Sequence, residues 1–275
     1  MTRSRRRPVA AVLVAPGTNR DPDACLALSL AGADPVVVPV TSLLRTRVAT
    51  GASAAPPATD ADRVVADADL IVVPGGFSYA DALGAGRLFA SELDHVLGDH
   101  LVTAAASGRP VIGICNGFQV LVRLGTWSRE GLRVALGHNA TGTFTCEWVE
   151  VEPPPSQRTG RDPSAQGHRP RCVWTDGLVG PVACPVAHGE GRLVADAATV
   201  AHLQATGRVA LTYVRNPNGS LGDIAGLTDA TGNVLGLMPH PENHVMARQH
   251  PGFHRGRTGG LGLQIFENGV RHARR

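Results

Sequence analysis

The chain has 275 residues, of which 43% are hydrophobic and 18% charged, and it carries a formal charge of +3. No apolar run approaches the roughly 20 residues of a transmembrane helix, and the arginine-rich start lacks the apolar core of a signal peptide. These features predict a globular, cytoplasmic protein with no membrane partner. Because the length permits a substantial core, we expect a single domain over residues 1–275, of which 1–7 form a basic tail.

The charges and cysteines exclude several classes of function. Seven of the arginines lie in the segments 1–7 and 271–275, where we expect them to be solvated, so the rest of the chain is mildly acidic. With few aromatic residues and no basic stripe, nucleic acid is not an expected partner. The absence of lysine argues against Schiff-base chemistry and against a P-loop. Five cysteines without metal-ligand spacing predict neither a disulfide framework nor a metal site.

The first 125 residues alternate between predicted strands and helices. Apolar runs that indicate buried strands lie at 9–15, 35–40, 69–73 and 111–114. A helix is expected from Asp21 to near Gly32, another continues from Leu88 to Leu101, and 49–58 is an expected loop. Such alternation implies right-handed crossovers. The pattern therefore predicts an α/β fold with an open, mostly parallel sheet flanked by helices.

The second half of the chain has a different texture. Short β-like runs separated by turn residues lie at 143–151, 192–195, 208–213, 223–227 and 234–238. We expect them to add antiparallel strands to the same sheet. The segment 152–171 is rich in Pro, Arg, Gln and Gly, which predicts an exposed loop insertion, and 262–272 is an expected terminal helix.

The most informative stretch is Gly113-Ile-Cys-Asn-Gly117, which follows an apolar run and precedes an amphipathic helical pattern. Gly-x-Cys-x-Gly is the cysteine form of the nucleophile elbow, a sharp strand-to-helix turn that exposes its central residue above the sheet. A cysteine at a helix N-terminus is also favoured as a thiolate. A lone cysteine is more often a buried structural residue. The flanking glycines nevertheless favour Cys115 as a nucleophile.

A cysteine nucleophile needs a base, and the base needs an orienting group. His240 lies in Met238-Pro-His-Pro-Glu242, directly after a predicted strand, and Glu242 is spaced to project to the same side. A histidine taken at random is more often a surface or core residue, but this context predicts a Cys115/His240/Glu242 triad. The hypothesis requires that the elements carrying these residues converge in space.

Acyl chemistry also needs donors for a developing oxyanion. Gly75 and Gly76 follow the strand at 69–73, and their backbone can approach a substrate closely. Asn116, at the start of the elbow helix, offers a second backbone N–H group. Because ligands of open parallel sheets bind beyond the carboxyl ends of the strands, these groups should meet at one edge. Pro-Gly-Gly alone is more often only a turn.

Three of these motifs together resemble the signatures of class I (triad) glutamine amidotransferases. They are Gly113–Gln119, Pro74–Tyr79 and Pro239–Glu242. Four motifs are similar to those of a narrower family, the glutaminase subunits of phosphoribosylformylglycinamidine synthase from purine biosynthesis: Pro16–Asn19, Ala187–Arg192, Asn216–Ser220 and Met238–Glu242. The resemblance spans residues 9 to about 245. The chain departs from the family's pattern at Ala80, where glycine is usual.

The resemblance implies a reaction. Cys115 would attack the side-chain amide of glutamine, His240 would protonate the departing ammonia, and a thioester would then be hydrolysed to glutamate. Gln119, the last residue of the elbow motif, would help to bind the glutamine. The motif Ala187–Arg192 is either a docking or substrate-loop element or simply a glycine turn between two strands.

The resemblance also implies partners. Ammonia would pass to a large synthetase subunit that converts formylglycinamide ribonucleotide to the amidine, with a small accessory subunit in the same complex. ATP and Mg²⁺ are expected on that synthetase subunit, and no cofactor is expected in this chain. Two alternatives stay open. The chain could be the glutaminase subunit of another synthase, or a non-catalytic binding subunit.

Overall fold

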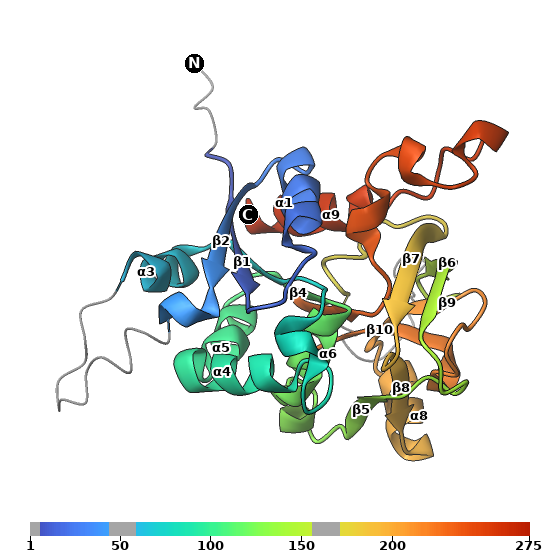
Figure 1. Ribbon diagram of the computed structural model, residues 1–275, viewed down its shortest axis with the longest axis horizontal. Helices are drawn as coiled ribbons and strands as arrows, with labels where there is room; N and C mark the ends of the chain where they lie inside the picture. Colours follow the sequence, from blue (N-terminus) through green and yellow to red (C-terminus); the bar gives the residue numbers. More distant parts are fainter. Residues whose placement is uncertain (1–5, 44–58, 156–170) are drawn as a thin grey trace, which may run out of the picture.

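The computed structural model describes residues 6–43, 59–155 and 171–275, whose arrangement Figure 1 shows. The loop expected at 49–58, most of the insertion expected at 152–171 and the first five residues lie outside the described residues. Within the described part, nine strands form one sheet in the order β2-β1-β3-β4-β11-β10-β9-β6-β7. The two halves of the chain thus share a sheet, as predicted.

The sheet consists of a parallel half and an antiparallel half. The parallel strands are β1 (Val9–Val14), β2 (Asp34–Pro39), β3 (Leu70–Val73), β4 (Val111–Ile114) and β11 (Val234–Leu237). The antiparallel strands are β10 (Ile224–Thr228), β9 (Val209–Tyr213), β6 (Thr145–Glu152) and β7 (Val182–His188). A second, two-stranded sheet joins β5 (Val134–Gly137) to β8 (Arg192–Ala195). The predicted fold class is confirmed.

The sequence patterns do not predict β5 or β7. β7 contains Pro185, a residue that cannot donate a hydrogen bond to a neighbouring strand. It is tolerated because β7 is the edge strand of the large sheet. β5 is short and mixed in composition, and only its pairing with β8, more than fifty residues away, makes it a strand.

Helices cover both faces of the sheet (Figure 1). Helices α1 (Asp21–Leu30) and α9 (Leu263–Ala273) lie on one face, and α4 (Arg87–Leu97), α5 (His100–Ala106) and α6 (Asn116–Arg123) lie on the other. Helices α3 (Asp60–Asp67) and α8 (Ala197–Ala205) lie elsewhere in the described residues. None of the helices in these ranges is long and apolar enough to span a bilayer.

The helix predictions are confirmed for α1, α6 and α9, but one predicted helix is two helices and two further helices were missed. The single helix expected from Leu88 to Leu101 is two helices, because Gly98 takes a positive φ of 48° that ends α4. Helices α3 and α8 were missed, although each begins with a recognisable capping residue, Thr59 or Asp196, whose side chain accepts a backbone N–H three residues on.

Three of the arginines at the chain ends make contacts that a solvated tail would not make. Arg6 pairs with Asp69 at 2.9 Å and Arg7 pairs with Asp34 at 3.1 Å. Arg274 donates to the carbonyl of Gly32 at 2.9 Å. All three arginines stay partly exposed, so each contact contributes at most about 1 kcal/mol. These contacts tie both ends of the described chain to the side of the sheet where β2 and β3 begin.

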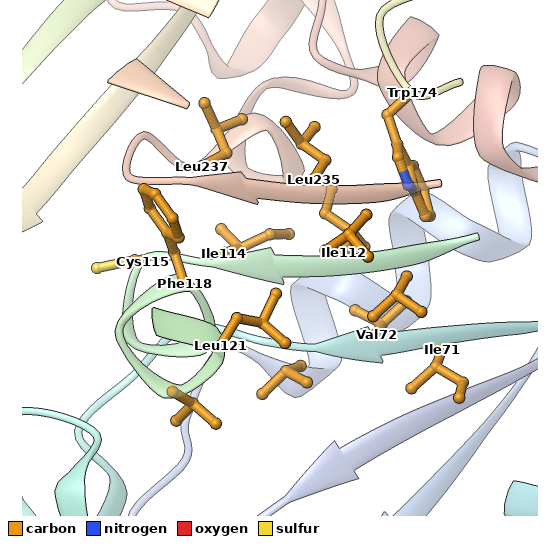
Figure 2. Packing of buried hydrophobic residues seen from close by; sticks show 14 of the residues in the cluster. Ile71, Val72, Ile112, Ile114, Cys115, Phe118, Leu121, Trp174, Leu235 and Leu237 are labelled. Atoms are coloured by element: carbon orange, nitrogen blue, oxygen red, sulfur yellow. The ribbon is translucent and has the colours of Figure 1, made fainter. Parts of the chain in front are cut away.

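The core lies around the central strands. β3, β4 and β11 are buried over their whole length, which accounts for their unbroken apolar sequences. Figure 2 shows Phe118 and Leu121 directed from α6 towards the strands that carry Ile114 and Leu237. A Cβ on Gly236 would lie 2.1 Å from the Phe118 ring, so the bare backbone there is what admits the ring. This packing fixes α6, and therefore the turn before it.

Candidate active site

Cys115 occupies the predicted elbow between β4 and α6. Its φ is +50° and its ψ −104°, a conformation that L residues rarely adopt and that costs on the order of 1–3 kcal/mol. The turn is enforced by both glycines. A Cβ on Gly117 would lie 1.8 Å from the carbonyl oxygen of Val73, and one on Gly113 would lie 2.5 Å from that of Gly117. Only Gly-x-Cys-x-Gly lets α6 approach the strands this closely.

The sulfur of Cys115 points away from the apolar cluster, beyond the end of β4 (Figure 2). The residue is 5% exposed, and its sulfur lies 3.9 Å from the carbonyl oxygen of Ala187 on β7. The backbone N–H of Cys115 donates to Leu237 at 2.7 Å, which ties the elbow to the end of β11. The thiol thus lies where the parallel half of the sheet meets the antiparallel half.

His240 and Glu242 form a buried pair beside this thiol. Nδ1 of His240 lies 2.7 Å from Oε1 of Glu242, and the two residues are 3% and 1% exposed. The backbone N–H of His240 donates to Pro185 on β7 at 2.9 Å, which fixes the segment. Burial opposes a charge on the ring, but the Glu242 carboxylate and then the Cys115 sulfur outweigh it and raise the pKa of His240 to about 10. A histidine in this setting holds its proton at neutral pH.

The loops after β1 and β3 meet at the carboxyl ends of the parallel strands, as predicted. Gly76 has a φ of 130° and forms a bridge with Thr18, and a Cβ on Gly76 would meet the backbone of Asn19 at 2.7 Å. A Cβ on Gly75 would lie 2.6 Å from Cε1 of His240, so glycine there makes room for the imidazole. Gly75 therefore lies against His240, and Gly76 lies against the loop after β1.

Asn116 and Gln119 form a polar network on the first turn of α6. Oδ1 of Asn116 accepts from the Ser78 hydroxyl at 2.6 Å, and its Nδ2 donates to Oε1 of Gln119 at 3.0 Å. Nε2 of Gln119 in turn donates to the carbonyl of Glu190 at 2.7 Å. The site residues predicted on the elbow helix thus connect to the glycine turn of the Ala187–Arg192 motif.

The Ala187–Arg192 motif forms the turn between β7 and β8, which agrees with the interpretation of this motif as a glycine turn. Two buried asparagines hold the turn in place. Nδ2 of Asn139 donates to the carbonyl of His188 at 2.8 Å, and Nδ2 of Asn218 donates to the carbonyl of Gly191 at 2.9 Å. Sequence reasoning missed Asn139, which carries no local signal. Asn218 does lie inside a quoted motif, Asn216–Ser220, but no role was assigned to it.

A strained segment lies beside the elbow. Tyr79, Ala80, Asp81 and Leu83 all have φ between 52° and 64°. Each such residue costs about 1–2 kcal/mol relative to right-handed backbone. Glycine, the usual residue of the family at the position of Ala80, adopts this conformation without penalty, which explains why it is usual there. Asp81 also lies within 3.4 Å of Nδ2 of Asn116, so the segment contacts the site.

A cysteine elbow facing a buried His–Glu pair, on a mostly parallel sheet with added antiparallel strands, defines a class I glutamine amidotransferase-like fold. Residues 7–273 match the CobB/CobQ-like glutamine amidotransferase domain, and the chain belongs to this family. The phosphoribosylformylglycinamidine synthase subunit PurQ of Treponema denticola is 38% identical, over 97% of this chain and 99% of the relative. That of Dehalococcoides mccartyi is 35% identical, over 96% of each.

Solved structures agree with these relatives. The structure of PurLQS from Thermotoga maritima contains a chain that is 31% identical, with a TM-score of 0.68 over 97% of this chain and 99% of that one. A protein from Thermoplasma acidophilum that is assigned to GMP synthase is similar at a TM-score of 0.52 and 16% identity, which shows the fold alone. The similarity extends over nearly the full length of the curated relatives.

Proposed function

We propose that this chain is the glutaminase subunit of phosphoribosylformylglycinamidine synthase. It hydrolyses glutamine and delivers the ammonia to a synthetase subunit, which converts formylglycinamide ribonucleotide to the amidine in de novo purine biosynthesis. The observation that carries the chemistry is the buried His240–Glu242 pair, at 2.7 Å, beside a cysteine on a strained elbow. The full-length similarity to the two PurQ subunits supports the choice of synthase.

The first half-reaction forms a thioester. The Cys115 sulfur attacks the carboxamide carbon of glutamine, and the backbone N–H groups of Gly76 and Asn116 stabilise the oxyanion, each by about 3 kcal/mol. His240 protonates the leaving nitrogen, which departs as ammonia. The raised pKa of His240 suits this role, because the ring carries the required proton at neutral pH. Gln119 helps to position the substrate beside the elbow.

The second half-reaction regenerates the enzyme. Water attacks the thioester carbonyl, a proton passes to Nε2 of His240, and the C–S bond breaks with its electron pair on sulfur. Glu242 keeps Nδ1 of His240 protonated and therefore leaves Nε2 free to take this proton. Glutamate leaves, and the elbow returns to its starting state.

The partner supplies the remaining chemistry. ATP and Mg²⁺ act on the large synthetase subunit, and a small accessory subunit completes a cytoplasmic complex. The related chain from Thermotoga maritima belongs to a structure named PurLQS, and this supports a partner for the present chain.

The test is glutamine-dependent amidation of formylglycinamide ribonucleotide by the complex of this chain with its synthetase subunit. Cys115→Ala should lower the glutamine-dependent rate by about 10³-fold or more. Amidation with ammonium chloride should be unchanged, because that route bypasses Cys115. Equal glutamine-dependent rates for the variant and the wild type would support a non-catalytic binding subunit. Glutaminase activity without any amidation of this ribonucleotide would indicate another synthase.

A further inference from the structure

Two phenylalanine rings stack on each other at the surface, although phenylalanine is a residue type that is usually buried. Phe77 is 43% exposed and Phe144 is 54% exposed. Their ring centroids lie 6.3 Å apart and their planes meet at 27°, which is the geometry of an aromatic pair. Neither ring takes part in the half-reactions of the triad, so the pair has another role.

Phe77 lies in the loop after β3, between two residues that contact the site. A Cβ on Gly75 would lie 2.6 Å from Cε1 of His240, so the start of this loop borders the triad. On the other side of Phe77, the hydroxyl of Ser78 donates to Oδ1 of Asn116, next to the nucleophile, at 2.6 Å. The position of the Phe77 ring therefore constrains the backbone that leads from the glycines to the elbow.

Phe144 belongs to the antiparallel half, where its neighbours in the sequence are fixed. Thr145 begins β6 and pairs with His188 of β7. The carbonyl of Thr143 accepts a hydrogen bond from a buried side-chain amide at 3.0 Å. A Cβ on Gly189 would lie 3.9 Å from Cδ2 of Phe144, so the ring lies against the β7–β8 turn. Phe144 thus offers a fixed ring to the loop after β3.

The β7–β8 turn contacts the elbow directly as well. The carbonyl of Ala187 lies 3.9 Å from the Cys115 sulfur, and the carbonyl of Glu190 accepts from Nε2 of Gln119 at 2.7 Å. The aromatic pair therefore completes a closed series of contacts. The series runs from the elbow to the loop after β3, across the two rings to the β7–β8 turn, and back to the elbow.

A loop with two consecutive glycines needs such contacts. Glycine populates many backbone conformations, so Gly75 and Gly76 do not by themselves fix the direction of a backbone N–H group. Gly76 has a φ of 130°, in the region that favours glycine. A donor to an oxyanion accelerates the reaction only if it is oriented before the charge develops. The side chains that follow the glycines must therefore hold the loop.

We propose that Phe144 is a positioning residue of the glutaminase reaction. By stacking on Phe77, it holds the backbone N–H of Gly76 towards the oxyanion that forms when Cys115 attacks glutamine. Neither ring exchanges a proton or forms a bond. The inference rests on the proposed function and adds a residue of the antiparallel half to the oxyanion site. It requires that the two rings act as one unit.

A double-mutant cycle in the complex with the synthetase subunit tests this role. The variants are Phe77→Ala, Phe144→Ala and the double variant, with Phe144→Tyr as the conservative change that keeps the ring. Phe253→Ala is the matched control, because it removes a partly exposed ring that stacks on His254. The measurement is single-turnover thioester formation at several glutamine concentrations. Rates are expressed per active site titrated with a glutamine-analogue electrophile, so that unfolded protein does not count.

We expect Phe144→Ala to lower the limiting rate about fivefold, as for the loss of one aromatic pair, with little change in the affinity for glutamine. Phe77→Ala should have the same effect. The double variant should also be about fivefold slower, rather than about 25-fold, because either substitution alone removes the contact. Phe144→Tyr should restore the rate, and Phe253→Ala should match the wild type.

Additive losses in the double variant, or a wild-type rate in Phe144→Ala, would overturn the inference. A loss that excess synthetase subunit reverses would also overturn it, because the rings would then serve to dock the partner. Amidation with ammonium chloride should stay at the wild-type rate in every variant, since that route bypasses the oxyanion site. A wild-type complex that hydrolyses no glutamine would instead overturn the proposed function, so the two failures are distinguishable.

Discussion

Glu242→Gln is the sharpest test of the triad, because it changes one atom of a buried pair. In the wild type, Oε1 accepts from Nδ1 of His240 at 2.7 Å, and Oε2 has no partner among the described residues. The variant removes the charge that raises the pKa of His240. Its amide can also present an N–H to Nδ1, which would put the imidazole hydrogen on Nε2 and block that nitrogen as a base.

The expected loss of stability is large at neutral pH. Removing one partner of a buried pair costs about 3–5 kcal/mol, because the other is left uncompensated. The sign with pH follows from the raised pKa of His240. The pair's contribution is fully present below the ordinary histidine value of 6.5 and is lost as pH rises towards about 10. The gap between wild type and variant should therefore narrow from pH 7 to pH 10.

Two measurements check this prediction. Urea unfolding at several pH values gives the stability gap, and single-turnover kinetics give thioester formation and hydrolysis separately. We expect the glutaminase rate to fall by about 10²–10⁴-fold, by analogy with the acid of a serine-protease triad. Glu267→Gln, on the exposed side of α9, is the matched control. A stability gap that stays constant over this range, or a variant as active as the control, would refute the reasoning.

Three further predictions address the surrounding structure. Gly117→Ala should prevent the native elbow, because its Cβ would lie 1.8 Å from the Val73 carbonyl; a soluble, active variant by circular dichroism and glutaminase assay would contradict this. Ala80→Gly should stabilise the chain by about 1 kcal/mol by relieving a φ of 52°, and a lower thermal midpoint would count against it. Asn139→Ala should lower stability by about 2–4 kcal/mol, since it removes the partners of a buried turn; unfolding at wild-type urea concentrations would show that the turn holds itself.

The part of the site that could be predicted from the sequence is the part encoded locally. Two glycines at fixed spacing predict the elbow because steric fit within one turn demands them. His240 and Glu242 are two residues apart, so their contact needs only a short extended segment. The meeting of three loops followed from a general property of parallel sheets.

The rest depends on contacts between distant segments. Asn139 reaches His188 across 49 positions in the sequence, and Gln119 reaches the turn at Glu190 across 71. Asn139 lies in no motif, and the motifs that contain Gln119, His188 and Glu190 do not show which residues these three contact. β7 is a strand because of its pairing with β6, and its proline conceals that pairing from any local rule. The residues that support the site were therefore missed, while the residues proposed to carry the chemistry lie in motifs that the sequence itself displays.

The order of the strands links folding of the whole chain to the existence of the site. β11 is the last strand in the sequence, yet it pairs in parallel with β4, directly before the elbow. That pairing places His240 beside Cys115, and the antiparallel strands between them in the sequence supply the contacts at Ala187 and Pro185. A chain that lacks its C-terminal strand keeps the cysteine but loses the contacts of Cys115 and Phe118 with β11, and it has no base and no orienting carboxylate. The triad thus forms only when both halves of the sheet are joined. Cys115 without its His240 partner therefore occurs only in unfolded or partly folded chains.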